Sequence, residues 1–207
     1  MRCIWLMSLT CRRISISNSN MQTALQQHFT AEDFLAWEEA QVEKHEFVAG
    51  EVFAMVGARQ DHVVVSGNIF AGLKQRLRGT PCRPYVADLK LRVDAADAFF
   101  YPDVMVSCHP GDLGNQQFIS NPSLVVEVLS DSTAAYDRGS KFAAYRQLES
   151  LKEYLIVDID ARRVECFSRT PDNDWLLHDY LGEVDCQLHS LSLSLPLAEI
   201  FEDIETA

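Results

Sequence analysis

The segment 124–130, with the sequence LVVEVLS, constrains the fold more than any other part of the chain. Its large aliphatic residues are typical of a strand that lies inside a sheet with both faces covered. Glu127 stands in the middle of this segment. A carboxylate in a dry core costs several kcal/mol unless it is paired, protonated or bound to a cation. The fold must therefore supply a partner for Glu127 inside a covered sheet.

The apolar patterns around this segment predict an α/β (α+β) fold with a mixed β-sheet flanked by helices. We expect strands on both sides of the Ala49-Gly50 turn and at 83–93, 99–107, 123–130, 153–159 and 163–169. Helices are predicted at 30–40, 61–78 and 138–149. This order of elements is neither that of a repeat protein nor that of a helical bundle.

Residues 1–20 differ in character from the rest, and we interpret them as a disordered tail or a mis-assigned start. Residues 21–207 are expected to form a single domain, a size that can bury a substantial core. The apolar run CIWLMSL is too short to cross a bilayer, so no membrane partner is expected. The six cysteines show no C-x-x-C pair and no close Cys/His grouping. This pattern argues against zinc and favours free thiols in a reducing cytoplasm.

The formal net charge of -12 argues at first sight against a nucleic-acid partner. From residue 171 onward, however, the chain has nine acidic residues and no Lys or Arg. Residues 1–170 therefore carry 18 basic and 21 acidic side chains, a net of -3, which leaves room for a phosphate-binding surface. The candidates for such a surface are Lys74, Arg76, Arg78, Arg83, Lys90, Arg92, Arg138 and Arg146. The alternative is that they are scattered, solvated surface charges.

A second acid, Asp103, is a candidate neighbour of Glu127. Side chains alternate along a strand, so in FFYPDVMV the carboxylate of Asp103 shares a face with large apolar residues, as Glu127 does in its own strand. If the two faces coincide on adjacent strands, the carboxylates lie close together and require a cation between them. Mg²⁺, or Mn²⁺ in its place, is suited to this position. Alternatively, Asp103 accepts a turn hydrogen bond and Glu127 pairs with Lys90.

Lys141, on the helix predicted after the strand of Glu127, is the candidate for a catalytic cation. A positive side chain at this position could orient water and stabilise charge that develops on a phosphate. The alternative is a surface pair with Asp137, four residues earlier, which would be worth only a few tenths of a kcal/mol.

Several motifs in this order resemble the Uma2 family. They are PD (102–103), EVLS (127–130), DRGSK--Y (137–145) and EYLIVD (153–158), and the resemblance extends from Phe29 to about Ile200. The family consists of restriction-endonuclease-like proteins of the PD-(D/E)xK nuclease superfamily. The resemblance implies a metal-dependent phosphodiesterase fold in which Asp103 and Glu127 are the Mg²⁺ ligands.

The superfamily pattern expects a lysine two residues after the glutamate, and this chain has Leu129 there. Lys141 matches a lysine that is supplied by a neighbouring helix instead. Glu46 falls where related nucleases often carry an additional acid, although it could equally be a solvated hairpin residue. His62 lies at a predicted helix start, where it either supports the site or caps the helix.

The leading hypothesis is a Mg²⁺-dependent endonuclease (a hydrolase) that cleaves phosphodiester bonds, with DNA as the expected substrate. Asp103, Glu127, Lys141 and Glu46 are its candidate catalytic residues. The second hypothesis is a catalytically inactive nuclease-like module with a binding or regulatory role, acting as a homodimer. Leu129 and the overall acidity favour this second hypothesis. A glycosidase with two carboxylates is a third option, disfavoured because no aromatic-rich sugar platform is visible.

Overall fold

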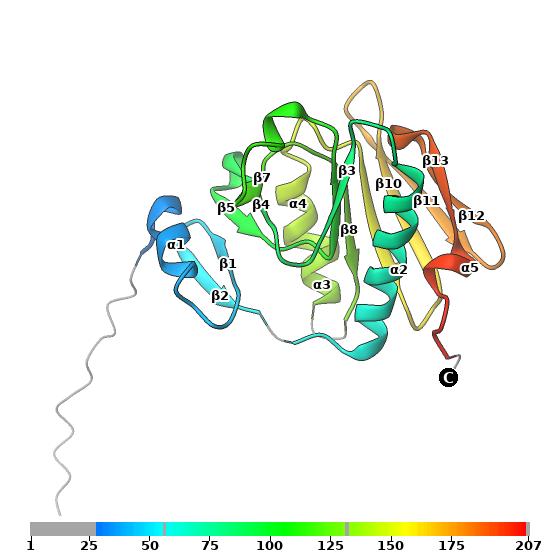
Figure 1. Cartoon of the computed structure of the whole chain (residues 1–207), viewed down its shortest axis with the longest axis horizontal. Helices are drawn as coiled ribbons and strands as arrows, with labels where there is room; N and C mark the ends of the chain where they lie inside the picture. Colours follow the sequence, from blue (N-terminus) through cyan, green and yellow to red (C-terminus); the bar gives the residue numbers. More distant parts are fainter. Residues whose placement is uncertain (1–27, 56, 131–132, 206–207) are drawn as a thin grey trace, which may run out of the picture.

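A six-stranded mixed sheet forms the centre of the protein in the computed structural model, which describes residues 28–55, 57–130 and 133–205 (Figure 1). The strand order is β11-β10-β9-β8-β6-β3. These strands are β3 (Arg83–Val86), β6 (Val104–Ser107), β8 (Pro122–Val128), β9 (Glu153–Asp158), β10 (Arg163–Arg169) and β11 (Trp175–Leu181). β8 and β9 are parallel, and the other neighbouring strands are antiparallel.

A second sheet of five strands, in the order β2-β1-β5-β4-β7, packs beside the first. Its strands are β1 (His45–Val48), β2 (Glu51–Ala54), β4 (Lys90–Val93), β5 (Ala98–Phe100) and β7 (Phe118–Ile119). Helix α1 (Ala31–Glu38) precedes it and begins with a capping box between Thr30 and Asp33. Phe34 of α1 packs on Phe47 and Phe99 of this sheet, so a small aromatic cluster fixes the helix to the strands.

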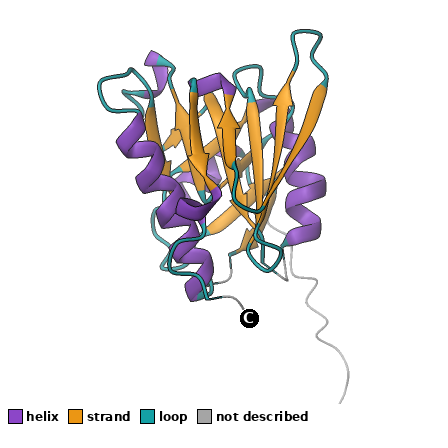
Figure 2. Cartoon of the chain, turned by 90° about the vertical axis from the view of Figure 1, so that its right-hand side faces the viewer, coloured by secondary structure: helices purple, strands orange, loops and turns teal. Residues whose placement is uncertain are grey.

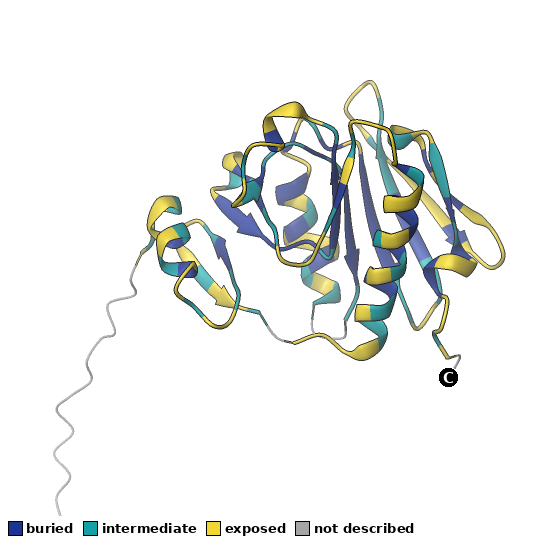
Figure 3. Cartoon of the chain, in the orientation of Figure 1, coloured by how far each residue is buried: buried dark blue, intermediate teal, exposed yellow. Residues whose placement is uncertain are grey.

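Helices cover both sides of the central strands (Figure 2). On one face lies α2 (Gln60–Arg76), whose Val65, Ile69 and Leu73 are fully or almost fully buried. The same face is covered by the hairpin of β12 (Asp185–Leu188) and β13 (Leu193–Pro196) and by α5 (Leu197–Ile200). Figure 3 shows the resulting contrast between the buried inner and exposed outer sides of α2.

The crossover between the parallel strands β8 and β9 covers the opposite face. It consists of α3 (Ala134–Tyr136), the π-helical turn η3 (Asp137–Lys141) and α4 (Phe142–Tyr145). Tyr145 packs edge-on against Phe100 of the second sheet and against Tyr154 of β9. The other short helices are the 3-10 turns η1 (Asp94–Ala96), η2 (Pro110–Asp112) and η4 (His189–Leu191).

The predicted fold class is confirmed, but two predicted strands are wrong in their extent. The strand expected at 99–107 is two strands, β5 and β6, which belong to different sheets and are separated by residues 101–103. Pro102 has no backbone N–H and cannot continue a ladder. The strand expected at 83–93 is divided in the same way into β3 and β4, with Ala87 at a φ of 50° in the interruption.

The helix expected at 138–149 starts earlier, at Ala134, and α4 ends at Tyr145. The predicted free thiols are wrong for Cys82 and Cys108, which form a disulfide, whereas Cys166 and Cys186 are free and buried. No helix in the described ranges is long and apolar enough to span a membrane. The predicted tail at 1–20 lies outside the described residues.

The central sheet offers a matched pair of leucines for testing its core. Leu155 of β9 is fully buried, whereas Leu176 of β11 is 63% exposed. Leu155→Ala should lower the free energy of unfolding by about 2–5 kcal/mol because it opens a cavity between covered faces. Leu176→Ala should change it by less than about 0.5 kcal/mol. Urea unfolding followed by circular dichroism measures both, and equal effects would contradict the described position of β9.

Candidate active site

Glu127 lies near the end of β8, and its side chain is on the face that the crossover covers. The side chains of β8 alternate between two cores: Val126 and Val128 belong to the core under α2, whereas Val125 belongs to the core under α4. Glu127 is two residues beyond Val125 on the same strand, so its side chain points to the same face of the sheet, the one that the crossover covers. It is only 3% exposed. The carboxylate is thus buried, as its apolar surroundings in the sequence predict.

Asp103 lies opposite Glu127, immediately before β6. The antiparallel register pairs Val104 with Val126, so one further step places Asp103 across from Glu127, and opposite residues of neighbouring strands share a face. The backbone N–H of Val128 donates a hydrogen bond to Asp103 Oδ2 at 2.8 Å. Both carboxylates line one cavity. The two acids that the sequence singled out therefore lie on the same side of the sheet.

His62, in the first turn of α2, contacts Asp103. Its Nε2 lies 3.2 Å from Asp103 Oδ2. The N-cap of α2 is Arg59, so His62 does not cap the helix. Burial favours the neutral ring, but the hydrogen bond and the negative charge of Asp103 raise the pKa of His62. The imidazole therefore ties the start of α2 to the carboxylate.

The ammonium of Lys141 lies among three carboxylates. Nζ is 3.0 Å from Glu46 Oε1, 3.2 Å from Glu127 Oε1 and 3.4 Å from Asp137 Oδ1. Lys141 is 6% exposed, and Glu46 and Asp137 are buried with it. The alternative prediction for Lys141 was an exposed ion pair with Asp137. The two residues do form a contact, but it lies in a buried cluster and not on the surface. Glu46 is likewise not a solvated hairpin residue.

Tyr145 is a member of this site that sequence reasoning did not single out. Its hydroxyl donates a hydrogen bond to Glu127 Oε1 at 2.7 Å, and the side chain is fully buried. Tyr145 is the last residue of the motif DRGSK--Y, which was the available signal. An aromatic residue on the buried face of a helix is common in protein cores, so the motif alone did not indicate a role in the site. Tyr154 adds a related contact, since its hydroxyl donates to the backbone oxygen of Asp137 at 3.0 Å.

The site shifts the ionisation of its own groups. Burial raises the pKa of Glu127 to about 8, with the charges of Asp103 and Asp137 acting in the same direction and Lys141 opposing them. Burial alone would lower the pKa of Lys141, but the carboxylates of Glu127, Glu46 and Asp137 outweigh it and raise that pKa well above its ordinary value. Lys141 therefore stays protonated at neutral pH.

These groups face a cavity of about 430 Å³ at one end of the central sheet. The first turn of α2 lines one side, and α3, η3 and the turn after β9 line the other. Figure 1 shows α3 and the N-terminal end of α2 at the same, lower end of the sheet. Asp103 and Glu127 are both among the lining residues of the cavity.

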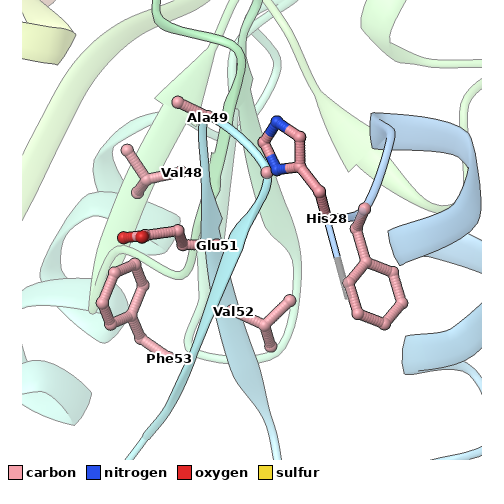
Figure 4. A pocket seen from close by; sticks show the side chains of 8 residues that line it. His28, Val48, Ala49, Glu51, Val52 and Phe53 are labelled. Carbon is pink, nitrogen blue, oxygen red and sulfur yellow. The ribbon is translucent and has the colours of Figure 1, made fainter. Parts of the chain in front are cut away.

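A second hollow, of about 640 Å³, lies beside the β1–β2 hairpin and next to His28, the first described residue. Its ionisable lining residues are His28 and Glu51. Figure 4 shows the Glu51 carboxylate directed away from the His28 ring. Although this hollow is larger, it brings no reactive groups together, so the cavity of Glu127 is the better candidate for an active site.

The Lys90 alternative is wrong, because Glu127 pairs with Lys141 and the ammonium of Lys90 lies over the ring of Tyr101, 5.4 Å from its centre. The remaining basic candidates do not gather at the cavity, and none of the eight is among its lining residues. Arg76 pairs with Glu199 at 2.9 Å, and Arg92 pairs with Asp94 at 2.7 Å. For these two arginines, the interpretation as ordinary surface charges is the better one.

The residues present fit a divalent cation held by two carboxylates. Within the described ranges, no group of three or more His, Cys, Asp or Glu residues is arranged to hold a metal ion. Mg²⁺ does not require one, because it commonly binds through one or two carboxylates and keeps waters and substrate oxygens as further ligands. Apart from the Lys141 ammonium, no described donor makes a hydrogen bond to the buried Glu46 Oε1 or Asp137 Oδ1. The site thus holds an excess of anionic oxygen atoms around a single ammonium.

The chain is similar to known proteins over most of its length. The family model Uma2, described as "Putative restriction endonuclease", matches residues 31–200. An uncharacterized protein of Synechocystis sp., slr1290, is 38% identical over 173 residues, which cover 84% of this chain and 91% of the relative. A second one, sll1609, is 36% identical over 165 residues, 79% of this chain and 93% of the relative.

The fold also matches a solved structure. The crystal structure of a putative nuclease belonging to DUF820 from Anabaena variabilis superposes with a TM-score of 0.68 at 14% sequence identity. The match covers 84% of this chain and 97% of the other. At this identity the likeness establishes the fold alone.

Removal of the Lys141 ammonium should destabilise the protein. Lys141→Met should lower the free energy of unfolding by about 3–5 kcal/mol, because it leaves buried carboxylates without their opposite charge. Lys74→Met, a matched change at an exposed position of α2, should alter it by less than about 0.5 kcal/mol. Chemical denaturation at neutral pH measures both changes. A small effect of Lys141→Met would show that the three contacts do not form.

The raised pKa of Glu127 makes stability depend on pH. Between its unfolded value near 4.5 and its folded value of about 8, the folded protein binds the extra proton, so stability falls as pH rises through this window. Glu127→Gln mimics the protonated acid and should remove this dependence. The quantity to compare is the melting temperature of the variant minus that of the unaltered protein, measured in metal-free buffer. This difference should be larger at pH 8 than at pH 5.5. A difference that is independent of pH would contradict the assigned burial.

Proposed function

The chain belongs to the Uma2 family, and from this membership and the geometry of the site we propose that it is a Mg²⁺-dependent endonuclease that hydrolyses phosphodiester bonds in DNA. One observation carries the proposal. Two carboxylates from separate segments, Asp103 just before β6 and Glu127 on β8, line the same cavity together with a buried, protonated lysine. Stability alone does not explain this arrangement, because buried charges are costly to a fold.

In this proposal Asp103 and Glu127 hold the metal ion, with Mn²⁺ as a substitute for Mg²⁺. When bound, the ion would supply positive charge to the phosphate and lower the pKa of a water. His62 and the backbone N–H of Val128 fix the carboxylate of Asp103, and the Tyr145 hydroxyl fixes that of Glu127. Ligands that are held in this way need no reorganisation when the ion arrives.

Lys141 has the properties of an electrostatic stabiliser and not of a base. Its raised pKa keeps the proton on Nζ at neutral pH, so it can donate a hydrogen bond to a phosphate oxygen as negative charge develops there. Glu46 and Asp137 contact the ammonium at 3.0 and 3.4 Å and hold it in place. We therefore propose that Glu46 acts by positioning Lys141, which replaces the outer-ligand or base role expected from the sequence.

The second candidate is a catalytically inactive, nuclease-like module. Leu129 in the position of the usual lysine favours it, and the retained pair of Asp103 and Glu127 disfavours it. For either candidate we propose a homodimer. The open edge of β11, which exposes Leu176, Leu177 and Leu181, supports this state. Light scattering that gives the mass of one chain at every concentration would contradict the dimer.

The enzyme proposal predicts that substitution of either acid abolishes activity while the protein remains folded. Glu127→Gln should leave a folded protein with no cleavage and weaker Mn²⁺ binding, and Asp103→Ala should abolish the rise in melting temperature that Mn²⁺ causes. Glu149→Gln, at an exposed position near the same crossover, serves as the matched control.

The measurements are calorimetric titration with Mn²⁺, thermal melting with and without the ion, and cleavage of labelled DNA. Metal binding that persists unchanged in both variants would disprove the ligand assignment. Metal binding without cleavage of any nucleic acid would favour the inactive module.

A further inference from the structure

The candidate active site is recessed, and this limits which form of DNA can reach it. Glu127 and Lys141 are 3% and 6% exposed, respectively, and they lie on the wall of a cavity of about 430 Å³. This is within the range of about 300–1,000 Å³ that small-molecule sites occupy. Proteins that bind duplex DNA specifically use a surface of about 1,000–2,500 Å². The cavity is therefore of a size for one nucleotide unit and its neighbours, not for a double helix.

The charge around the cavity is unfavourable for a duplex. Six carboxylates line it, including Asp61, Asp158 and Asp160 at the rim, against the two permanently charged cations Arg59 and Lys141. Duplex DNA carries one negative charge for about every 1.7 Å of its axis. A double helix laid across this opening would bring many phosphates toward acidic side chains. A single flexible strand can present one phosphate at a time.

Arg59, just before α2, is exposed on the cavity wall, but the exposed basic residues at the other end of α2 lie far from it. Lys74 is twelve residues beyond His62 on α2, which corresponds to about 18 Å along the helix axis. Arg78 and Arg83 follow at that same far end. Arg138, which is nearer the cavity, is already paired with Glu165 and lies 3.8 Å from Asp158. Near Tyr101 on the cavity wall, Lys44 is paired with Asp88, and the ammonium of Lys90 lies over the Tyr101 ring. A duplex backbone at the cavity would therefore meet more carboxylates than basic side chains among the described residues.

The cavity wall has apolar side chains in addition to its charges. Met55, Leu129 and Ile159 line it and are partly exposed. Apolar surface beside the proposed catalytic centre suits an unpaired base, whose flat face is free only when it is not stacked in a duplex. The wall thus offers contacts to single-stranded DNA that an intact double helix cannot use.

We propose that the substrate is single-stranded DNA, either free or as an unpaired tail on a duplex, which enters the cavity as one strand. This inference rests on the proposed nuclease function and specifies its substrate class. Cleavage inside an intact duplex would first require unstacking and unpairing, at a cost of a few kcal/mol. The acidic rim provides no compensating attraction.

The first test compares three substrates of the same sequence with Mn²⁺ present: a single strand, a blunt duplex and a duplex with an unpaired tail. Single strands and tails should be cut about 30- to 1,000-fold faster than duplex interiors, the ratio that corresponds to an opening cost of about 2–4 kcal/mol. Equal rates on the blunt duplex would overturn the inference and leave the nuclease proposal standing. Cleavage of none of the three would count against both.

The second test measures binding alone, by fluorescence anisotropy of labelled single strands with EDTA present, so that it does not depend on cleavage. Asp160→Asn, which removes one charge from the exposed rim, should strengthen binding several-fold, whereas Lys74→Gln at the far end of α2 should leave it unchanged. The opposite pattern would place the nucleic acid at the basic end of α2 and overturn the inference. If the two variants change binding as expected but the protein cleaves no substrate, single-stranded DNA is supported as the ligand and the catalytic proposal is refuted.

Discussion

The contact of one ammonium group with three carboxylates is the interaction on which the site depends. Lys141 reaches Glu46, Glu127 and Asp137 from the crossover between β8 and β9, and it joins three parts of the fold that are distant in sequence. Desolvation of so many charges is costly, and each charge is tolerated only because the others are present. The cluster thus binds the five-stranded sheet, the central sheet and the crossover into one arrangement. With one ammonium for three carboxyl groups, the cluster contains more acidic than basic groups.

The sequence was sufficient to single out the two acids, and the reason is local, whereas their common face depends on the register of β6 and β8. Alternation along a strand and the cost of a buried carboxylate are properties of a few neighbouring residues, so Asp103 and Glu127 could be recognised without a structure. The interruption between β5 and β6 did not disturb this prediction, because Asp103 and Met105 are two residues apart and their side chains still point to the same face of the sheet. It did invalidate the single strand at 99–107, since nothing local shows that its halves belong to different sheets.

The remaining site residues depend on packing at long range. Glu46 is in a hairpin of only two short strands, which looks solvated, and it is buried because β1 lies between β2 and β5. Tyr145 resembles any core aromatic residue until its hydroxyl is seen to meet Glu127. The disulfide of Cys82 and Cys108 follows from the pairing of Arg83 with Ser107, which brings residues 26 positions apart to opposite places on neighbouring strands. No spacing rule in the sequence encodes such a register.

The parallel pairing of β8 with β9 has a consequence for how the protein reaches its folded state. Parallel neighbours cannot be joined by a tight turn, so the entire segment carrying Lys141 must be closed into a loop before β9 can dock beside β8. Until that closure occurs, Glu127 has no ammonium nearby, and the nascent strand exposes a charge where its neighbours are aliphatic. The candidate site therefore forms only with the slow, non-local steps of folding, and a partly folded chain would lack it.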